Sequence, residues 1–233
     1  MLPDPDRLVA ELTALWPWEA IAVALAIAYL VLAIRESVWC WPAGIGSTLI
    51  YLVLFYGSRL YAECVLQLFY VGVSIYGWHR WASAAKQESA LACLPQGEPT
   101  ADPNRVGGAQ APTRIVTWRP GQHAVALGAI VLLAAVSGAL LSTYTPAALP
   151  YLDSLTAWAS VVTTWMVARK VLENWFYWFV IDSLSVYIYV RRGLWLTAGL
   201  FLLYLVLIVI GYRAWRRTML DARMPPTGQA HGA

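Results

Sequence analysis

The amino-acid sequence predicts an all-α integral membrane protein, in which seven transmembrane helices form two parallel three-helix repeats joined by a linker helix (3+1+3). Three observations lead to this fold class. Of the 233 residues, 60% are hydrophobic and only 12% are charged, whereas soluble domains contain about 25% charged residues. The apolar residues gather in runs close to the ~20 residues that cross a bilayer. The two halves of the chain also match each other in sequence.

The first three predicted spans lie near the N-terminus. The short segment before them is acidic and lacks the basic start of a secretory signal, so we expect the first span to remain in the protein. Pro42 falls in the first turn of the second span, where a missing backbone N–H does no harm. The predicted ranges are Trp18–Ile34, Trp39–Tyr56 and Leu60–Trp81.

A loop and a fourth span separate the two halves. Residues Ala82–Gln122 are rich in Pro, Gly and charged residues, which is typical of a solvated loop, and Ala124–Thr143 forms the linker span. The last three spans are Leu155–Val171, Asn174–Val190 and Leu194–Trp215. The predicted parts are the N-terminal tail with the first repeat (1–81), the cytoplasmic loop with the linker helix (82–150), the second repeat (151–217) and a disordered cytoplasmic tail (218–233).

The basic residues predict the orientation, because Lys and Arg gather on the cytoplasmic side of a membrane protein. Arg7, Arg59, Arg191 and Arg192 lie on one side of the predicted bundle, and the other twelve basic residues lie on the opposite side. We therefore expect a periplasmic N-terminus and a cytoplasmic C-terminus.

Residues in the first half of the chain match residues in the second half, which predicts an internal repeat. Glu36 and Trp41 match Glu173 and Trp178 at an offset of 137. The other matches have an offset of 134 and pair Leu60, Tyr61, Tyr70, Gly77, Trp78 and Trp81 with Leu194, Trp195, Tyr204, Gly211, Tyr212 and Trp215. Each unit has an odd number of spans and the linker adds one more, so both units are expected to cross the membrane in the same direction, as in many transporters.

Polar side chains form stripes along two of the predicted spans. In the sixth span the stripe is centred on Asp182, and a carboxylate at the bilayer centre costs roughly 2.5 to 3.5 kcal/mol, so such residues face a bundle interior or a watery cavity. The third span carries a second stripe. We predict a midplane small-molecule site with aromatic walls that suits a planar, partly polar or cationic solute. Its candidate residues are Trp41, Gln67, Tyr70, Trp78, Asn174, Trp178, Asp182, Ser185 and Tyr189.

The sequence lacks the residue patterns that are typical of other classes of protein. Cys40, Cys64 and Cys93 form no CxxC pair and are expected to be free thiols. The histidines, His79, His123 and His231, make no HExxH motif and no nucleophile–base pair, so we expect no enzyme activity, no metal and no cofactor. The net charge of +3 does not favour a nucleic-acid partner. The lipid bilayer is the expected surrounding.

Several sequence runs resemble the PnuC family of nicotinamide riboside transporters. They are Trp41-Pro42-Ala43-Gly44-Ile45, Arg59-Leu60-Tyr61-Ala62-Glu63, Leu66-Gln67-Leu68-Phe69-Tyr70, Ser74 to Trp81, Glu173 to Trp178 continuing to Asp182, and Gly211 to Trp215. They cover the second, third, sixth and seventh spans. Glu63 stands where the family pattern leads us to expect Asp, and the loop Ala82–Gln122 is longer than expected.

The resemblance implies a function. It implies a bundle similar to the SWEET sugar transporters that moves nicotinamide riboside by facilitated diffusion across the bacterial inner membrane, with trapping by a cytoplasmic kinase and assembly into a homo-oligomer, a trimer. Thiamine or riboflavin transport within the same family is an alternative, and a proton-coupled carrier is another, because Asp182 is an acid within a span.

Roles for the candidate residues follow as hypotheses. The nicotinamide ring stacks on Trp41, Trp78 or Trp178, and Asp182 balances the pyridinium charge. Gln67 or Asn174 binds the carboxamide, and Tyr70, Ser185 or Tyr189 meets the ribose hydroxyls. The competing interpretations are interfacial anchoring for tryptophans near helix ends, above all Trp81 and Trp215, and interhelical hydrogen bonding for Gln67 and Asn174.

Overall fold

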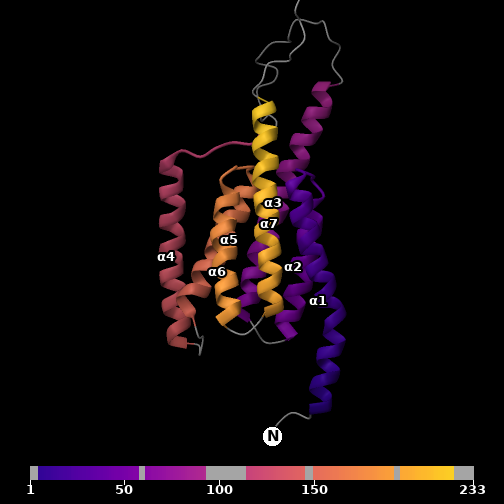
Figure 1. The fold of residues 1–233 in the computed structure, drawn as a ribbon, viewed down its shortest axis with the longest axis vertical. Helices are drawn as coiled ribbons and strands as arrows, with labels where there is room; N and C mark the ends of the chain where they lie inside the picture. The colour runs from indigo at the N-terminus through magenta and orange to yellow at the C-terminus, as the bar shows by residue number, and fades with distance from the viewer. Residues whose placement is uncertain (1–4, 58–60, 93–113, 145–148, 192–194, 223–233) are drawn as a thin grey trace, which may run out of the picture. The chain divides into compact units, whose positions relative to one another are not determined.

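A computed structural model describes residues 5–57, 61–92, 114–144, 149–191 and 195–222. In these residues the chain forms seven α-helices (Figure 1). Their bounds are α1 Pro5–Ile34, α2 Cys40–Gly57, α3 Tyr61–Ala92, α4 Pro120–Tyr144, α5 Pro150–Ala168, α6 Asn174–Arg191 and α7 Trp195–Asp221. The all-helical prediction is confirmed for this part of the chain, and the parallel 3+1+3 arrangement stays a prediction.

Within the described residues, four helices are long and apolar enough to cross a membrane. Their apolar stretches are Pro17–Ile34, Cys40–Gly57, Pro120–Tyr144 and Ala198–Asp221. The polar stripes predicted for α3 and α6 lower the hydropathy of those helices. α3 also continues to Ala92, into the segment expected to be loop, because residues 82–92 are rich in strong helix formers such as Ala, Lys, Gln and Glu.

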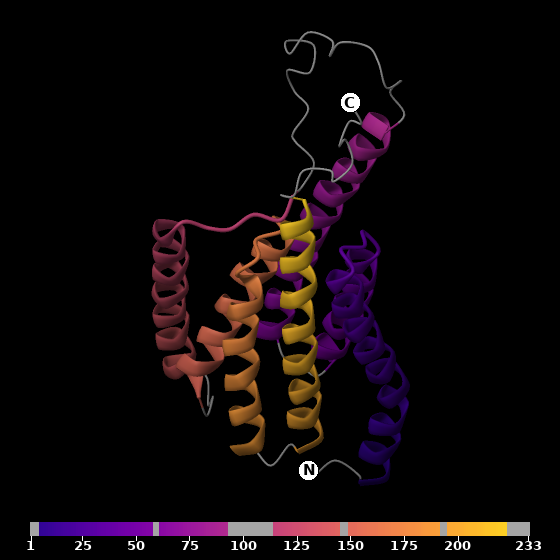
Figure 2. The same ribbon diagram turned by 45° about the horizontal axis from the view of Figure 1, so that its top comes forward.

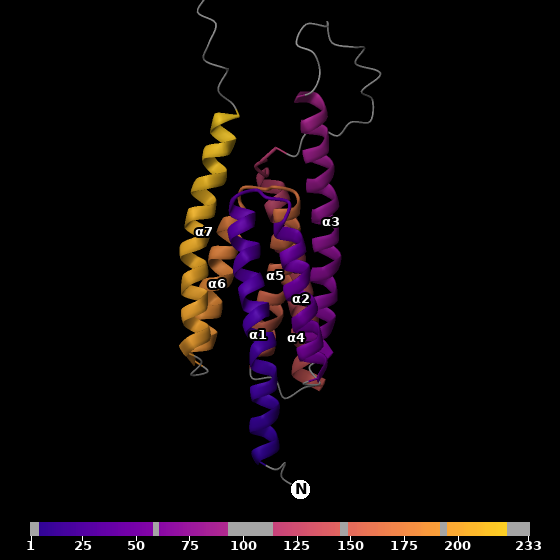
Figure 3. The same ribbon diagram turned by 90° about the vertical axis from the view of Figure 1, so that its right-hand side faces the viewer.

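The chain divides into two compact units, Met1–Trp78 and His79–Ala233, and each is described by itself. In the first unit α1 and α2 lie side by side (Figure 3). The Ser47 hydroxyl of α2 donates a hydrogen bond to the Ala22 carbonyl of α1 over 2.8 Å. Gly44 lies so near Tyr29 that an added Cβ would be 3.0 Å from that ring. Small residues on α2 therefore leave room for the side chains of α1 to pack closely.

In the second unit each helix from α4 to α7 packs on its neighbour in the chain (Figure 2). α4 buries Ala126, Ile130, Ala134 and Gly138, which are four residues apart and so share one face. The predicted linker helix is thus fixed to α5 along its length. Two further contacts join α4 to α5: Trp158 Nε1–H donates to Ser137 Oγ over 3.1 Å, and Gly138 meets Tyr151.

Trp81 and Trp215 are core residues of the second unit. Both are almost completely buried, and their ring centroids are 6.2 Å apart. The Trp81 Nε1–H donates to the carbonyl of Ala168, the last residue of α5, over 3.1 Å. The alternative of interfacial anchoring does not fit these two side chains, because the rings pack inside the protein.

The two units contain the same turn. α1 ends at Ile34 and α5 ends at Ala168, and the chain then reverses through Glu36 (φ 55°) and Lys170 (φ 51°), both in the left-handed region. In each turn two N–H groups bond back to the helix end in the pattern of a Schellman motif. These bonds are Glu36 N–H to Ala33 O (3.1 Å), Ser37 N–H to Leu32 O (3.0 Å), Lys170 N–H to Val167 O (2.9 Å) and Val171 N–H to Met166 O (3.0 Å).

A tryptophan that follows each turn packs on a glycine of the third helix of its repeat. Trp41 covers Gly77, and Trp175 covers Gly211, so closely that a Cβ on either glycine would lie within 3.0 Å of the ring. The two pairs are related by an offset of 134. The same offset relates the two turns, the first residues of α2 and α6, and the first residues of α3 and α7, a spacing of 134 in each case.

The predicted offset of 137, which paired Trp41 with Trp178, is therefore wrong. The structural counterpart of Trp41 is Trp175. Residues 175 and 178 are both tryptophans and lie about one helical turn apart, on the same side of α6. A sequence comparison can therefore pair Trp41 with either of them. The contact with glycine distinguishes them, and a single offset serves the whole repeat.

Alanine substitutions at these two glycines test the shared contact. Gly77→Ala and Gly211→Ala are each expected to lower the free energy of unfolding by about 1 to 3 kcal/mol, because the new methyl group displaces a buried indole ring. Thermal unfolding of the detergent-purified protein measures the loss. Gly72→Ala and Gly199→Ala on the same helices are the matched controls, because a Cβ there meets no atom within 4 Å. Equal stability of all four variants would contradict the packing.

Candidate functional site

The candidate residues of the first unit have different surroundings. Trp41 is fully buried between Gly77 and Tyr29, and the Tyr29 ring meets it edge to face with centroids 6.0 Å apart. Gln67 and Tyr70 are half-buried, and Trp78 is 43% exposed. Trp41 thus packs the first unit together, and a role for these four residues in a substrate site stays a prediction.

The second unit brings four candidates onto one face of α6. Asn174, Trp178, Asp182 and Ser185 are spaced at four, four and three residues, so they form one stripe along the helix. Asn174, Asp182 and Ser185 are buried, and Trp178 is half-buried. The side chain of Tyr189, the fifth predicted member, lies outside the described residues. The predicted stripe is therefore a buried polar surface for the part that can be described.

The hydrogen bonds of this stripe are incomplete. Asn174 Nδ2 donates to the Val171 carbonyl over 2.6 Å, whereas its Oδ1 is buried and accepts no hydrogen bond within the described part of the chain. Ser185 Oγ bonds within its own helix, to the carbonyl of Ile181 (3.0 Å). Asp182 is 4% exposed, and no described group donates to its carboxyl or pairs with it. Buried polar groups without partners are costly, so this surface is the candidate site of the second unit.

The first repeat has different side chains at the described positions that match this stripe. At the offset of 134, Trp178 corresponds to Gly44 and Asp182 to Thr48, not to Ile45 as the 137 offset implied. The Thr48 hydroxyl bonds to the Gly44 carbonyl over 2.8 Å within its own helix, which a carboxylate has no proton to do. The remaining pairs are Asn174 with Cys40 and Ser185 with Tyr51.

The two repeats also differ in which helix of the first pair carries the large side chain. The first unit places the large Tyr29 against Gly44. The second unit has the smaller, fully buried Thr163 at the position of Tyr29 and the large Trp178 at the position of Gly44. The same helix pair therefore carries its aromatic ring on the first helix in one unit and on the second helix in the other.

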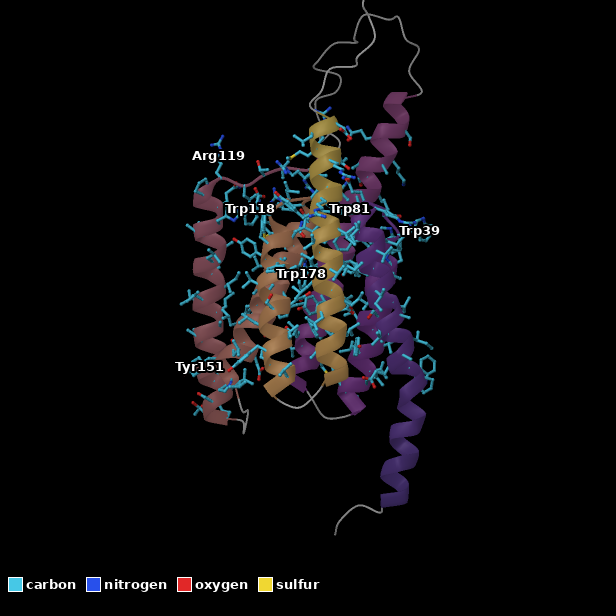
Figure 4. All side chains as sticks on the ribbon, in the orientation of Figure 1. Trp39, Trp81, Trp118, Arg119, Tyr151 and Trp178 are labelled. Carbon is cyan, nitrogen blue, oxygen red and sulfur yellow. The ribbon has the colours of Figure 1, made fainter. Side chains whose placement is uncertain are left out.

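A second cluster, which sequence reasoning missed, lies where the chain enters α4 and α6. His123 Nδ1 and Tyr177 Oη are 2.9 Å apart, and their rings are stacked at 18°. The Trp118 backbone N–H donates to Glu173 Oε2 (3.2 Å), and the Trp118 ring lies 5.9 Å from that of Trp165. Figure 4 shows Trp118 on the side of α5 and Arg119 directed away from the helices. A tryptophan in an otherwise polar segment was the one available signal.

The cysteines and other potential ligands make no further site. Cys40 and Cys64 are buried free thiols, and Cys93 lies outside the described residues. Among the residues that the structure describes, no three His, Cys, Asp or Glu side chains are placed to hold a metal ion.

Comparison with known proteins places the chain among vitamin transporters. The family model "Nicotinamide mononucleotide transporter" matches residues 16–217. The nicotinamide riboside transporter PnuC of Escherichia coli (strain K12) is 24% identical over 201 residues, which cover 84% of each chain. The riboflavin/roseoflavin transporter RibM of Streptomyces davaonensis is 25% identical over 202 residues, which cover 85% of this chain and 84% of RibM.

A solved structure shares the fold. The crystal structure of the vitamin B3 transporter PnuC superposes with a TM-score of 0.61 at 21% sequence identity, covering 88% of this chain and 82% of that one. The resemblance to PnuC proteins found in the sequence is confirmed by the family match. The chain belongs to the nicotinamide mononucleotide transporter family, which includes the PnuC proteins, and is a multi-pass membrane transporter.

Proposed function

We propose that this transporter carries nicotinamide riboside, a flat pyridinium cation, and that the buried face of α6 binds it. The observation that carries the proposal is Asp182, a buried carboxyl without a described partner. A cationic ring supplies the charge that the protein does not. The indole of Trp178, one turn away, offers a face on which an aromatic cation stacks. Asn174 Oδ1, which lacks a donor, accepts a hydrogen bond from the carboxamide.

Riboflavin is the second candidate, because the RibM match has about the same identity as the PnuC match. The charge of the site favours nicotinamide riboside. Riboflavin is neutral at physiological pH and leaves the carboxyl of Asp182 without a counter-charge, whereas nicotinamide riboside and thiamine are cations. Thiamine therefore shares the electrostatic argument and differs in ring shape.

The proposed mode is facilitated diffusion across the bacterial inner membrane, with phosphorylation by a cytoplasmic kinase as the step that retains the vitamin. The N-terminus is proposed to be periplasmic, from the distribution of Lys and Arg. The chain is proposed to work as a homotrimer. Proton coupling is the alternative mode, because a buried acid such as Asp182 is the kind of group that takes up a proton in coupled carriers.

Competition for uptake tests the substrate. Proteoliposomes that contain the purified protein are given labelled nicotinamide riboside together with an excess of unlabelled nicotinamide riboside, thiamine or riboflavin. We expect strong competition by nicotinamide riboside, weaker competition by thiamine and the weakest by riboflavin. Riboflavin displacing the label better than nicotinamide riboside would overturn the charge argument.

Replacing Asp182 by the residue of its repeat counterpart tests the charge. Asp182→Thr is expected to reduce the apparent affinity for nicotinamide riboside roughly 10- to 100-fold, because an interaction with a charged partner is worth about 1.5 to 3 kcal/mol. Ser183→Ala, at an exposed position of the same helix, is the control and keeps normal uptake. Thermal unfolding shows whether both variants are folded. Unchanged affinity in a folded Asp182→Thr protein would exclude this role.

An ionophore distinguishes the two modes of transport. Collapsing an imposed proton gradient is expected to leave the initial rate of nicotinamide riboside uptake within about twofold, because a diffusion carrier uses only the substrate gradient. Proteoliposomes with no gradient serve as the reference. A rate that follows the direction of the proton gradient would favour the proton-coupled alternative.

A further inference from the structure

The chain that leads into α4 is bonded to the turn that leads into α6. Residues 114–119, which we call the strap, run extended into α4 (Figure 2), and Val116 forms a parallel backbone bridge with Val171. The Val116 N–H donates to the Lys170 carbonyl (3.0 Å), and the Val116 carbonyl accepts from the Leu172 N–H (2.8 Å). The strap therefore holds the turn on both sides of Val171.

Side chains extend this attachment into the first turn of α6. The Trp118 N–H bonds to the carboxylate of Glu173, the residue before α6. The Trp118 ring contacts the rings of both Trp165 and His123, with centroids 5.9 Å and 5.4 Å away. His123, at the start of α4, stacks on Tyr177 and shares a hydrogen bond with its hydroxyl. The first turn of α6 is thus held by the backbone before it and by a ring within it.

The strap also determines where the Asn174 side chain lies. The Val171 carbonyl accepts both the backbone N–H of Asn174 (3.2 Å) and its Nδ2–H (2.6 Å). Val171 is the residue bridged to the strap. A movement of the strap therefore displaces the carbonyl that fixes the orientation of the Asn174 amide.

The first repeat shows that the turn does not need a strap in order to form. Its turn at Glu36 has the same left-handed residue and the same helix-end hydrogen bonds. Ser37 occupies the position of Val171, and in the described residues no backbone bridge is made to it. The strap is an addition to the repeat that carries the polar stripe, so its contribution lies in the first turn of α6 rather than in the fold of the turn.

We infer that the strap and His123 are positioning elements, which hold the first turn of α6, and with it the Asn174 amide, in the orientation that meets the substrate. Loosening them weakens substrate binding without unfolding the protein. The inference rests on the proposed function for the identity of the substrate. The physical attachment of the strap to α6 can be measured without any substrate.

Hydrogen exchange tests the attachment. Tyr177→Phe removes the hydroxyl and keeps the ring stack, and Glu173→Ala removes the acceptor for Trp118. Both are expected to speed amide exchange in residues 172–178 about fivefold, the factor that corresponds to one hydrogen bond. Glu173→Gln retains an acceptor and is expected to stay close to the unsubstituted protein. Tyr187→Phe, at an exposed position further along α6, is the control. Unchanged exchange in both Tyr177→Phe and Glu173→Ala would overturn the inference.

Uptake kinetics test the consequence for binding. Tyr177→Phe and Glu173→Ala are expected to raise the half-saturating concentration of nicotinamide riboside about fivefold, with a maximal rate within twofold, and Glu173→Gln is expected to restore it. Faster exchange with an unchanged half-saturating concentration would overturn the positioning role. If the unsubstituted protein does not transport nicotinamide riboside, the proposed function fails, and the exchange experiment still decides whether the strap holds α6.

Discussion

The contact between a tryptophan ring and a glycine is the constraint on which each repeat depends. Trp41 lies on Gly77 and Trp175 on Gly211, each pair joining the helix after the turn to the next helix. In a membrane, apolar side chains gain little by leaving lipid for other apolar side chains, so helices associate through close packing at small residues. A large rigid ring seated on a bare backbone supplies such packing at one defined place. Because both repeats use it at the same spacing, they share one frame.

Because the two repeats share this packing, the side chains along the second helix of each repeat are free to differ. Trp178 and Asp182 stand at the positions of Gly44 and Thr48, although α2 and α6 have matching bounds and follow matching turns. In the first repeat this face is used for packing, since Gly44 receives Tyr29. In the second it holds a carboxyl and an amide oxygen without described partners. The first repeat forms the same scaffold without these polar groups, so the fold does not need them. Costly buried groups that the fold does not need are typical of a functional site.

The sequence predicted those features that depend on composition and helical period. Seven helices and the α6 stripe were predicted because long apolar runs and spacings of three and four residues are direct consequences of helix geometry. The register of the repeat was wrong at Trp178, because two tryptophans one turn apart match equally well until the glycine contact is seen. The strap was missed because Val116 acts through its backbone, which any residue possesses.

The strap holds the N-terminal end of α6 in place. The first N–H groups of a helix lack partners within the helix, so its first turn opens most easily. At α6 that turn contains Asn174, whose Oδ1 is proposed to accept a hydrogen bond from the substrate and therefore needs one orientation of the amide. Each added hydrogen bond contributes roughly 0.5 to 1.5 kcal/mol, so the few bonds from Val116, Trp118 and His123 suffice to oppose fraying. α4 is the neighbour that holds this helix end, because it is packed along α5 of the same unit and delivers both the strap and His123.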